Sequence, residues 1–139
     1  MTKRVALVLG ISGQDGSYLA ELLVSKGYDV HGMLRKVTNP SPNIDAVKPY
    51  ITLHYGDLAT ENHLCKIIHD LVPDEIYNLA SQSDVAASFE IPEYTGDIAG
   101  IGVTRILEAI RHFSPKSKLY QASTAEMFGG SRVPQTEDT

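Results

Sequence analysis

Three glycines spaced three residues apart mark the part of the sequence best suited to holding a phosphate group. They follow a continuous apolar run, Val5–Leu9, and precede a helical pattern over Ser17–Lys26. Glycines permit a tight turn and a close backbone approach to a diphosphate, while the amino end of a helix offers free N–H groups and partial positive charge. The alternative is a plain strand-to-helix connection; a P-loop is excluded because no Gly-Lys-Ser/Thr follows. The predicted diphosphate site consists of Gly10, Ile11, Ser12, Gly13, Gln14, Asp15 and Gly16.

Two cations after the second predicted strand indicate which dinucleotide this turn serves. An NAD site usually places a carboxylate there, on the ribose 2′-hydroxyl. Here the strand Asp29–Leu34 is followed by Arg35 and Lys36, and its only acid, Asp29, lies at the opposite end. A guanidinium can form a forked pair with a 2′-phosphate, so Arg35 favours NADP over NAD. The alternative is a solvated basic pair at the edge of a loop.

A carboxylate and a leucine follow the third predicted strand, Ile51–Tyr55. Asp57 can accept a hydrogen bond from the adenine amino group, and Leu58 can pack on the adenine ring. The alternative is that the carboxylate only marks the start of a helix, with Thr60 as its cap.

Small side chains follow the fourth predicted strand, Glu75–Leu79. Ala80 and Ser81 would let the middle of a dinucleotide pass close to the backbone. This signal is weak when taken alone, because alanine and serine are also common in ordinary loops.

These segments need a framework that brings the ends of the strands together. Short apolar runs alternate with helical stretches, and this alternation predicts a parallel sheet with right-handed crossovers. We therefore expect a Rossmann-type, doubly wound α/β fold, in one dinucleotide-binding domain over residues 1–139, with loops at 37–50 and 129–139. The predicted strands are Val5–Leu9, Asp29–Leu34, Ile51–Tyr55, Glu75–Leu79 and Leu119–Ala122, and the predicted helices are Ser17–Lys26, Ala59–Leu71 and one from Pro92 to about Phe113.

Composition excludes several classes of protein. The 139 residues are 42% hydrophobic and 21% charged, which is ordinary for a globular chain and unlike a disordered one. The net charge of −5 argues against a nucleic-acid partner, since such proteins are usually basic. No apolar stretch approaches a membrane span, and no Cys or His spacing predicts a metal site. A lone cysteine, Cys65, and a start that lacks a signal-peptide pattern predict a cytoplasmic protein.

Five segments, in order along nearly the whole chain, resemble the GDP-mannose 4,6-dehydratases of the extended short-chain dehydrogenase/reductase family. The strings GQDGSYLAE and YQAST-x-E are far more specific than a glycine motif. The resemblance implies an NADP-dependent hydro-lyase that converts GDP-mannose to its 4-keto-6-deoxy product. The matching segments are GISGQDGSY (10–18), Val30–Arg35, YGDL (55–58), DEIYNLASQS (74–83) and YQASTAEMFG (120–129).

The resemblance also implies roles for single residues. Thr124 and Glu126 match the active-site threonine and glutamate of the family. Thr124 would hydrogen-bond the sugar C4 oxygen, and Glu126 would remove the C5 proton and protonate the departing 6-hydroxyl. Without the resemblance, a turn-capping threonine and a solvent-facing glutamate are the simpler interpretations. Tyr94 would reach the cofactor from the long helix, and the nicotinamide ribose would be lined by Leu79, Ala80, Ser81, Gln82 and Ser83.

The sequence departs from the family pattern in one major respect. The family also uses a Tyr-x-x-x-Lys pair on one helical face, and none of the seven tyrosines here has a lysine four residues later. We therefore expect the front part of an enzyme, which stops before that helix and before the substrate domain, binds cofactor and does not complete the reaction alone. Smaller departures are Ala125 and Asp84, where the family often has serine and histidine.

The long helix carries more apolar residues than one buried stripe can hold. In the family this helix contributes to a dimer face, so we expect an exposed apolar patch and a homo-oligomer, either a dimer or a tetramer. The apolar positions are Ile98, Ile101, Val103, Ile106, Leu107 and Ile110.

Two other functions stay open on the sequence alone. One is a stand-alone nucleotide-binding module without catalysis, and the other is the front half of a different nucleotide-sugar epimerase or reductase. Glu126 favours a dehydratase over an epimerase, because an epimerase needs no base for elimination between C5 and C6.

Overall fold

A five-stranded parallel sheet organises the computed structural model, which describes residues 2–36, 41–131 and 134–139. The strand order is β3-β2-β1-β4-β5, so the chain winds outward from β1 in one direction and then returns to continue in the other. This confirms the predicted doubly wound Rossmann-type fold. The reversal between β1 and β4 leaves a crevice at the carboxyl ends of the strands, where such sheets bind ligands. The strands are β1 (Val5–Leu9), β2 (Asp29–Leu34), β3 (Ile51–Tyr55), β4 (Glu75–Asn78) and β5 (Lys118–Gln121).

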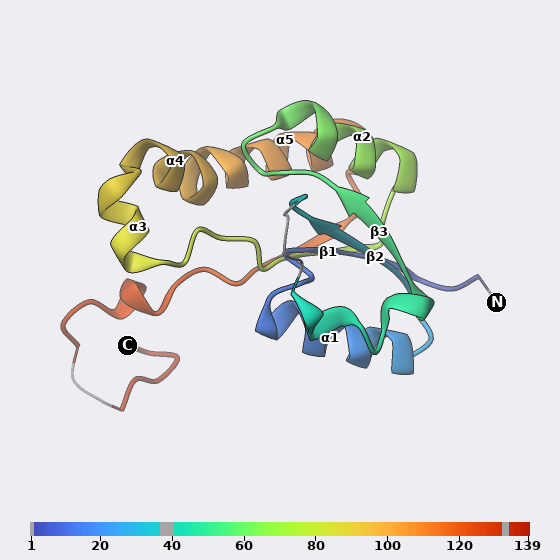
Figure 1. Cartoon of the computed structure of the whole chain (residues 1–139), viewed down its shortest axis with the longest axis horizontal. Coiled ribbons are helices and arrows are strands. Elements are labelled where there is room, and N and C mark those ends of the chain that lie inside the picture. The colour runs from blue at the N-terminus through green and yellow to red at the C-terminus, as the bar shows by residue number, and fades with distance from the viewer. Residues whose placement is uncertain (1, 37–40, 132–133) are drawn as a thin grey trace.

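Helices cover both faces of the sheet (Figure 1). Helix α1 (Gln14–Ser25) lies on one face, and α2 (Glu61–Leu71) and α5 (Gly102–Phe113) lie on the other. Alternate strand residues therefore enter two separate cores, as expected for strands buried on both sides. The α1 core includes Ala6, Val8, Ala20, Leu23 and Val30, and the α2–α5 core includes Leu7, Leu9, Leu64, Ile68, Ile76 and Ile106.

Helix α1 begins at Gln14, three residues before the predicted start at Ser17. Gly13 is its N-cap in an extended conformation, and the Ser17 hydroxyl donates to the Gln14 carbonyl at 2.7 Å. The first turn holds Gln, Asp and Gly, which show no apolar periodicity, so the sequence pattern missed it. As predicted, the helix stops before Gly27, which adopts φ +79°.

The long helix has the predicted limits but is not uniform. It starts as α4 (Pro92–Gly96), widens into a π-helical turn over Asp97–Ile101, and continues as α5 to Phe113. A short helix that was not predicted, α3 (Val85–Glu90), precedes it and is capped by the Asp84 carboxylate, which accepts from the Ala87 N–H at 3.2 Å. Together α3 and α4 extend beyond the sheet as an arm (Figure 1).

The remaining differences from the predicted elements are small. Helix α2 begins at Glu61 instead of Ala59, because residues 57–60 form a tight turn. Strands β4 and β5 each end one residue early. The predicted loop at 37–50 contains two 3-10 turns, Pro42–Ile44 and Lys48–Tyr50, and its residues 37–40 lie outside the described part. Among the helices that the structure describes, none is long and apolar enough to cross a membrane.

The glycine turn packs backbone directly against backbone. Gly10 has φ +80°, and a Cβ there would lie 2.9 Å from the Ala80 backbone nitrogen. A Cβ at Gly16 would overlap the Gly10 carbonyl oxygen and would lie 2.8 Å from the Ile11 Cα. The turn therefore has room for glycine alone at these two positions, and its backbone is left facing outward from the end of β1.

We expect Gly16→Ala to lower the free energy of unfolding by about 1–3 kcal/mol, because the added methyl group forces the turn apart. Gly96→Ala is the matched control: Gly96 is helical and its Cβ would meet nothing within 4 Å, so this change should raise stability by up to about 1 kcal/mol. Urea unfolding of the two variants measures both effects. If the Gly16→Ala and Gly96→Ala variants unfolded at the same urea concentration, the turn would not be tightly packed.

Candidate functional site

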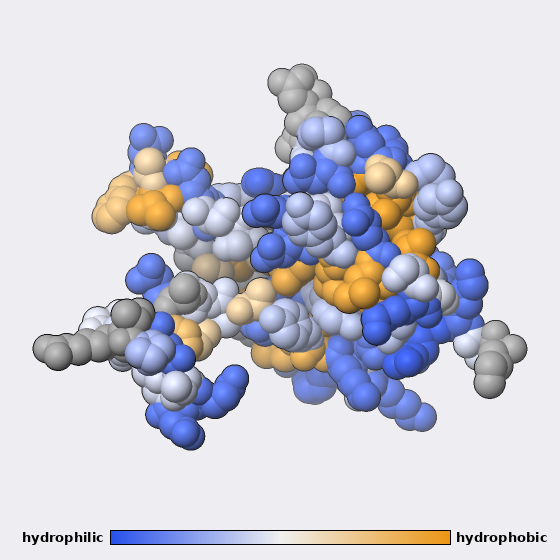
Figure 2. All heavy atoms as spheres, turned by 90° about the horizontal axis from the view of Figure 1, so that it is seen from below, coloured by the Kyte–Doolittle hydropathy of each residue, from blue (hydrophilic) through white to orange (hydrophobic). Residues whose placement is uncertain are grey.

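A groove of about 1100 Å³ runs along the carboxyl ends of the strands. The glycine turn, the ends of β2 to β5 and the inner side of the α4–α5 helix all line it. Figure 2 shows this end of the molecule as a hollow between two projections. The groove brings together all but one of the residues predicted for the site: Gly10, Ser12, Gly13, Gln14, Asp15, Gly16, Arg35, Asp57, Leu58, Leu79, Ala80, Ser81, Gln82, Ser83, Tyr94, Thr124 and Glu126.

The residue that does not line the groove is Ile11. Its side chain is fully buried in the α1 core, and a Cβ at Gly32 would collide with it. Ile11 thus supports the glycine turn from beneath, and only its backbone belongs to the turn surface. An apolar residue between two glycines was the sequence signal for this inward position.

The diphosphate end of the groove is formed by backbone. Gly13, Gln14 and Asp15 are exposed at the amino end of α1, where the first N–H groups of a helix have no partner within the helix. Such an end attracts anions through these N–H groups and the helix dipole. Because a Cβ at Gly10 or Gly16 would meet the backbone of Ala80, Gly10 or Ile11, the two glycines let the turn pack closely beneath the amino end of α1.

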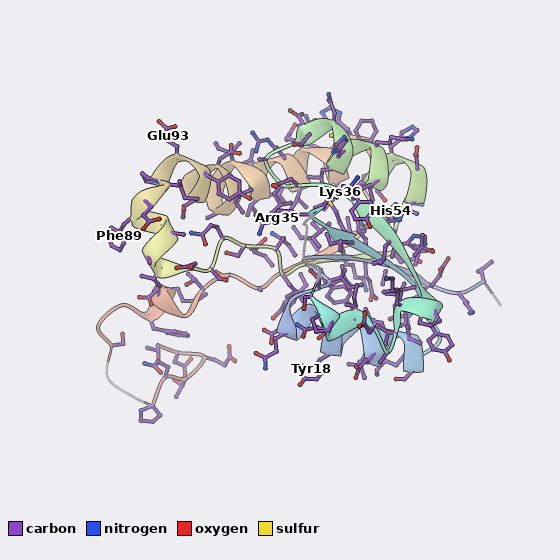
Figure 3. The ribbon with its side chains drawn as sticks, in the orientation of Figure 1. Tyr18, Arg35, Lys36, His54, Phe89 and Glu93 are labelled. Carbon is purple, nitrogen blue, oxygen red and sulfur yellow. The ribbon has the colours of Figure 1, made fainter. Side chains whose placement is uncertain are left out.

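Three side chains meet farther along the groove, at the ends of β2 and β3. An Arg35 Nη1 donates to the Tyr94 hydroxyl oxygen at 2.8 Å, and that hydroxyl lies 3.4 Å from Asp57 Oδ2. The other carboxylate oxygen of Asp57 accepts from the Ala59 N–H at 2.9 Å. Thr60, the alternative cap, forms no side-chain cap hydrogen bond. Figure 3 shows Arg35 between the sheet and the α4–α5 helix, whereas Phe89 and Glu93 point outward.

The segment after β4 depends on a buried amide that the sequence analysis did not select. Asn78 is 1% exposed; its Nδ2 donates to Gln121 Oε1 at 2.8 Å, and its Oδ1 accepts from the Ala80 N–H at 3.2 Å. Asn78 thereby ties the ends of β4 and β5 together and sets the path of the backbone past Gly10. A polar residue ending an apolar strand was the only sequence signal.

The two residues predicted for catalysis follow β5. Thr124 and Glu126 are exposed and line the groove, and the Thr124 Oγ1 accepts from the Glu126 N–H at 3.2 Å. This hydrogen bond caps a 3-10 turn, Ala125–Phe128. Thr124 therefore does cap a turn, as the simpler interpretation of the sequence predicted. Toward the residues that the structure describes, the Thr124 hydroxyl makes no hydrogen bond as a donor. Ser123, just before them, has φ +62°, an uncommon conformation for a residue with a side chain and one enriched at functional sites.

Sequence comparison identifies relatives of this chain. The family model for GDP-mannose 4,6 dehydratase matches residues 7–139. Among curated proteins, GDP-mannose 4,6-dehydratase from Vibrio cholerae serotype O1 is 47% identical over all of this chain, and the Arabidopsis thaliana and Homo sapiens proteins are 46% and 44% identical over 99% of it. The chain spans about 40% of the length of these relatives.

Structure comparison supports the same fold. A UDP-glucose 4-epimerase from Brucella ovis, solved in complex with NAD, has a TM-score of 0.82 at 23% identity over 97% of this chain and 40% of its own. The epimerase from Stenotrophomonas maltophila, solved with bound NAD and formylated UDP-arabinopyranose, reaches 0.84 at 19% identity over 98% of this chain and 41% of its own. These likenesses establish the fold, and the family model covers nearly the whole sequence. The chain therefore belongs to the GDP-mannose 4,6-dehydratase family.

Proposed function

We propose that this chain provides the NADP-binding part and two catalytic residues of a GDP-mannose 4,6-dehydratase. The observation that carries the proposal is that a single groove gathers the glycine turn, Arg35, Asp57, Thr124 and Glu126 from separate strand ends. The names of the relatives support the reaction, and the NAD in the solved neighbours supports a dinucleotide in this groove. The one cysteine, Cys65, is consistent with the cytoplasm as its compartment.

Different groove residues would contact different parts of the dinucleotide. The backbone of the glycine turn would hold the diphosphate, and Arg35 would pair with the 2′-phosphate. Asp57 would accept from the adenine amino group beside Leu58, and residues 79–83 with Tyr94 would line the nicotinamide half. Arg35 is the only cation among the groove residues that the structure describes, so it is the group best placed to choose between NADP and NAD.

The chemistry at the end of β5 follows from the acidity of the sugar. The glycine turn and Arg35 would hold NADP in the groove, where it would supply hydride transfer from C4 and back to C6. The Thr124 hydroxyl would donate a hydrogen bond to the C4 oxygen. Beside a C4 carbonyl the C5 proton becomes acidic, so the Glu126 carboxylate can remove it and then protonate the C6 hydroxyl, which leaves as water. No tyrosine in the sequence has a lysine four residues later, so the chain lacks the pair that would remove the C4 hydroxyl proton, and we expect no turnover from it alone.

Arg35→Ala should narrow the preference for NADP over NAD by about 10- to 100-fold, because it removes a charged hydrogen-bond donor to the 2′-phosphate. Arg111→Ala is the matched control, since Arg111 pairs with Glu108 on the exposed side of α5, does not line the groove and should leave the ratio unchanged. Calorimetric titration of both dinucleotides measures the ratio. Equal affinities for NADP and NAD in the unmodified chain would refute the proposed selectivity.

Glu126→Gln should slow elimination by about 10²-fold or more, because it removes the proton acceptor while keeping the shape of the side chain. The test uses an enzyme completed with the Tyr-x-x-x-Lys helix and substrate domain of a relative. Oxidation at C4, followed by nicotinamide absorbance, should persist while the 4-keto-6-deoxy product is lost. Glu93→Gln, on the outer side of the arm, is the control. Parallel loss of both steps in Glu126→Gln would contradict the assigned role.

We also propose self-association through the long helix. Ile98 and Ile106 enter the core, but Ile101 and Leu107 are 53% and 51% exposed on the same helix. Apolar residues also gather at the end of the α3 arm, where Phe89 is 83% exposed (Figure 2). Exposed apolar surface of this kind favours association.

Light scattering should therefore give a mass above that of one chain, and Leu107→Glu should lower it by placing a charge in the contact. Glu108→Gln, on the neighbouring exposed position, should leave the mass unchanged. A monodisperse monomer of the unmodified chain at the concentrations used for binding would rule out the proposed contact.

A further inference from the structure

Arg105 connects helix α5 to the turn that carries Asp57 and Leu58. Its Nη1 donates to the Leu58 carbonyl oxygen at 2.9 Å and to Asp97 Oδ2 at 3.0 Å. The side chain is only 20% exposed, and its hydrogen bond to Asp97 raises the pKa of Arg105 above its ordinary value. Asp97 is the first residue of the π-helical turn, so one guanidinium nitrogen joins that helical turn to the turn that carries Leu58.

Helix α5 also touches this turn through a glycine. Leu58 is 2% exposed, and a Cβ at Gly102 would lie 3.0 Å from the Leu58 Cβ. The helix therefore approaches Leu58 as closely as a residue without a side chain allows. Gly102 limits how near the turn can come, and the Arg105 hydrogen bond limits how far it can move away.

Internal hydrogen bonds hold the shape of the turn but not its place. The Asp57 carboxylate accepts from the Ala59 N–H, and the Asp57 carbonyl accepts from the Thr60 N–H, both at 2.9 Å. These contacts remain the same if the whole turn shifts relative to α5. Three longer-range hydrogen bonds join the turn to the rest of the described chain: the Gly56 N–H donates to the Leu34 carbonyl at 3.1 Å, the Tyr94 hydroxyl lies 3.4 Å from Asp57 Oδ2, and Arg105 donates to the Leu58 carbonyl. Of these three, the Arg105 contact joins the turn to α5, across 47 positions of the sequence.

We propose that Arg105 is a positioning residue for adenine recognition. It acts through the Leu58 carbonyl, holding the Asp57 carboxylate at the depth in the groove where it accepts from the adenine amino group. This inference rests on the proposed function, in which the Asp57 carboxylate accepts from the adenine amino group. The Leu58 side chain, predicted to pack on the adenine ring, is instead buried in the α2–α5 core. Arg105 itself does not line the groove.

The test compares NADP with its analogue in which hypoxanthine replaces adenine, using calorimetric titration of the full chain. Hypoxanthine presents a carbonyl oxygen where adenine presents the amino group, so the Asp57 carboxylate should reject it. We expect the unmodified chain to prefer the adenine form about tenfold or more, and Arg105→Met to reduce that preference to about threefold or less. Partial unfolding would weaken both dinucleotides equally and leave the ratio unchanged, so the ratio reports positioning.

Arg111→Met is the matched control, since Arg111 lies on the same helix but pairs with Glu108 on its exposed side and should keep the full preference. Asp97→Ala removes the carboxylate that accepts from Arg105, so it should also reduce the preference for the adenine dinucleotide. This variant tests the role of Arg105 if Arg105→Met does not fold. Full preference in whichever of these two variants folds would overturn the role of Arg105.

Asp57→Asn separates this inference from the proposed function. An amide can accept from adenine or donate to hypoxanthine, so the preference should fall to near one. An unmodified chain that shows no preference would overturn both the adenine placement and the role of Arg105. Loss of preference in Asp57→Asn but not in Arg105→Met would overturn the role of Arg105 alone.

Discussion

The contact on which the groove depends is backbone against backbone, between the glycine turn after β1 and the loop after β4. Gly10 lies so close to Ala80 that no Cβ fits, and a Cβ at Gly16 would overlap the Gly10 carbonyl oxygen. The two strands meet at the reversal of the sheet order, where the chain has just changed its winding direction. Because these backbones touch, the amino end of α1 and the segment 79–83 border the same groove.

Polar side chains then connect the other strand ends to this pair. Asn78 joins β4 to β5 through Gln121, and Tyr94 joins the ends of β2 and β3 through Arg35 and Asp57. Each of these contacts crosses between elements far apart in sequence. The site is therefore assembled by the sheet as a whole, and a change at one strand end is expected to alter its neighbours as well as its own ligand contact.

Local patterns predicted the parts of the fold that local physics controls. Apolar runs such as Val5–Leu9 gave the strand bounds, and Gly27 gave the end of α1. The start of α1 and the whole of α3 were missed, because polar first turns and a six-residue helix capped by Asp84 show no apolar periodicity. The π-helical turn at Asp97–Ile101 was also missed, because the apolar pattern from Pro92 to Phe113 predicts one uninterrupted helix.

The candidate site was predicted more fully than its supporting residues. Glycines and charged residues at strand ends carry a recognisable chemical signal, so Arg35, Asp57 and Glu126 could be predicted as site residues from the sequence and its resemblance to the family. Asn78 carries only the weak signal of a polar residue at the end of an apolar strand, and Arg105 carries none, because their importance comes from partners 43 and 47 residues away. Ile11 was assigned to the site by its place in the turn, and its side chain instead enters the core.

Amide hydrogen exchange with and without NADP tests the central claim most directly, because it reports each backbone segment separately. Bound NADP should slow exchange in residues 10–17 and 79–83 together, since both border the groove at the reversal of the sheet. Protection confined to another surface, or no protection at saturating NADP, would contradict a dinucleotide site at this contact.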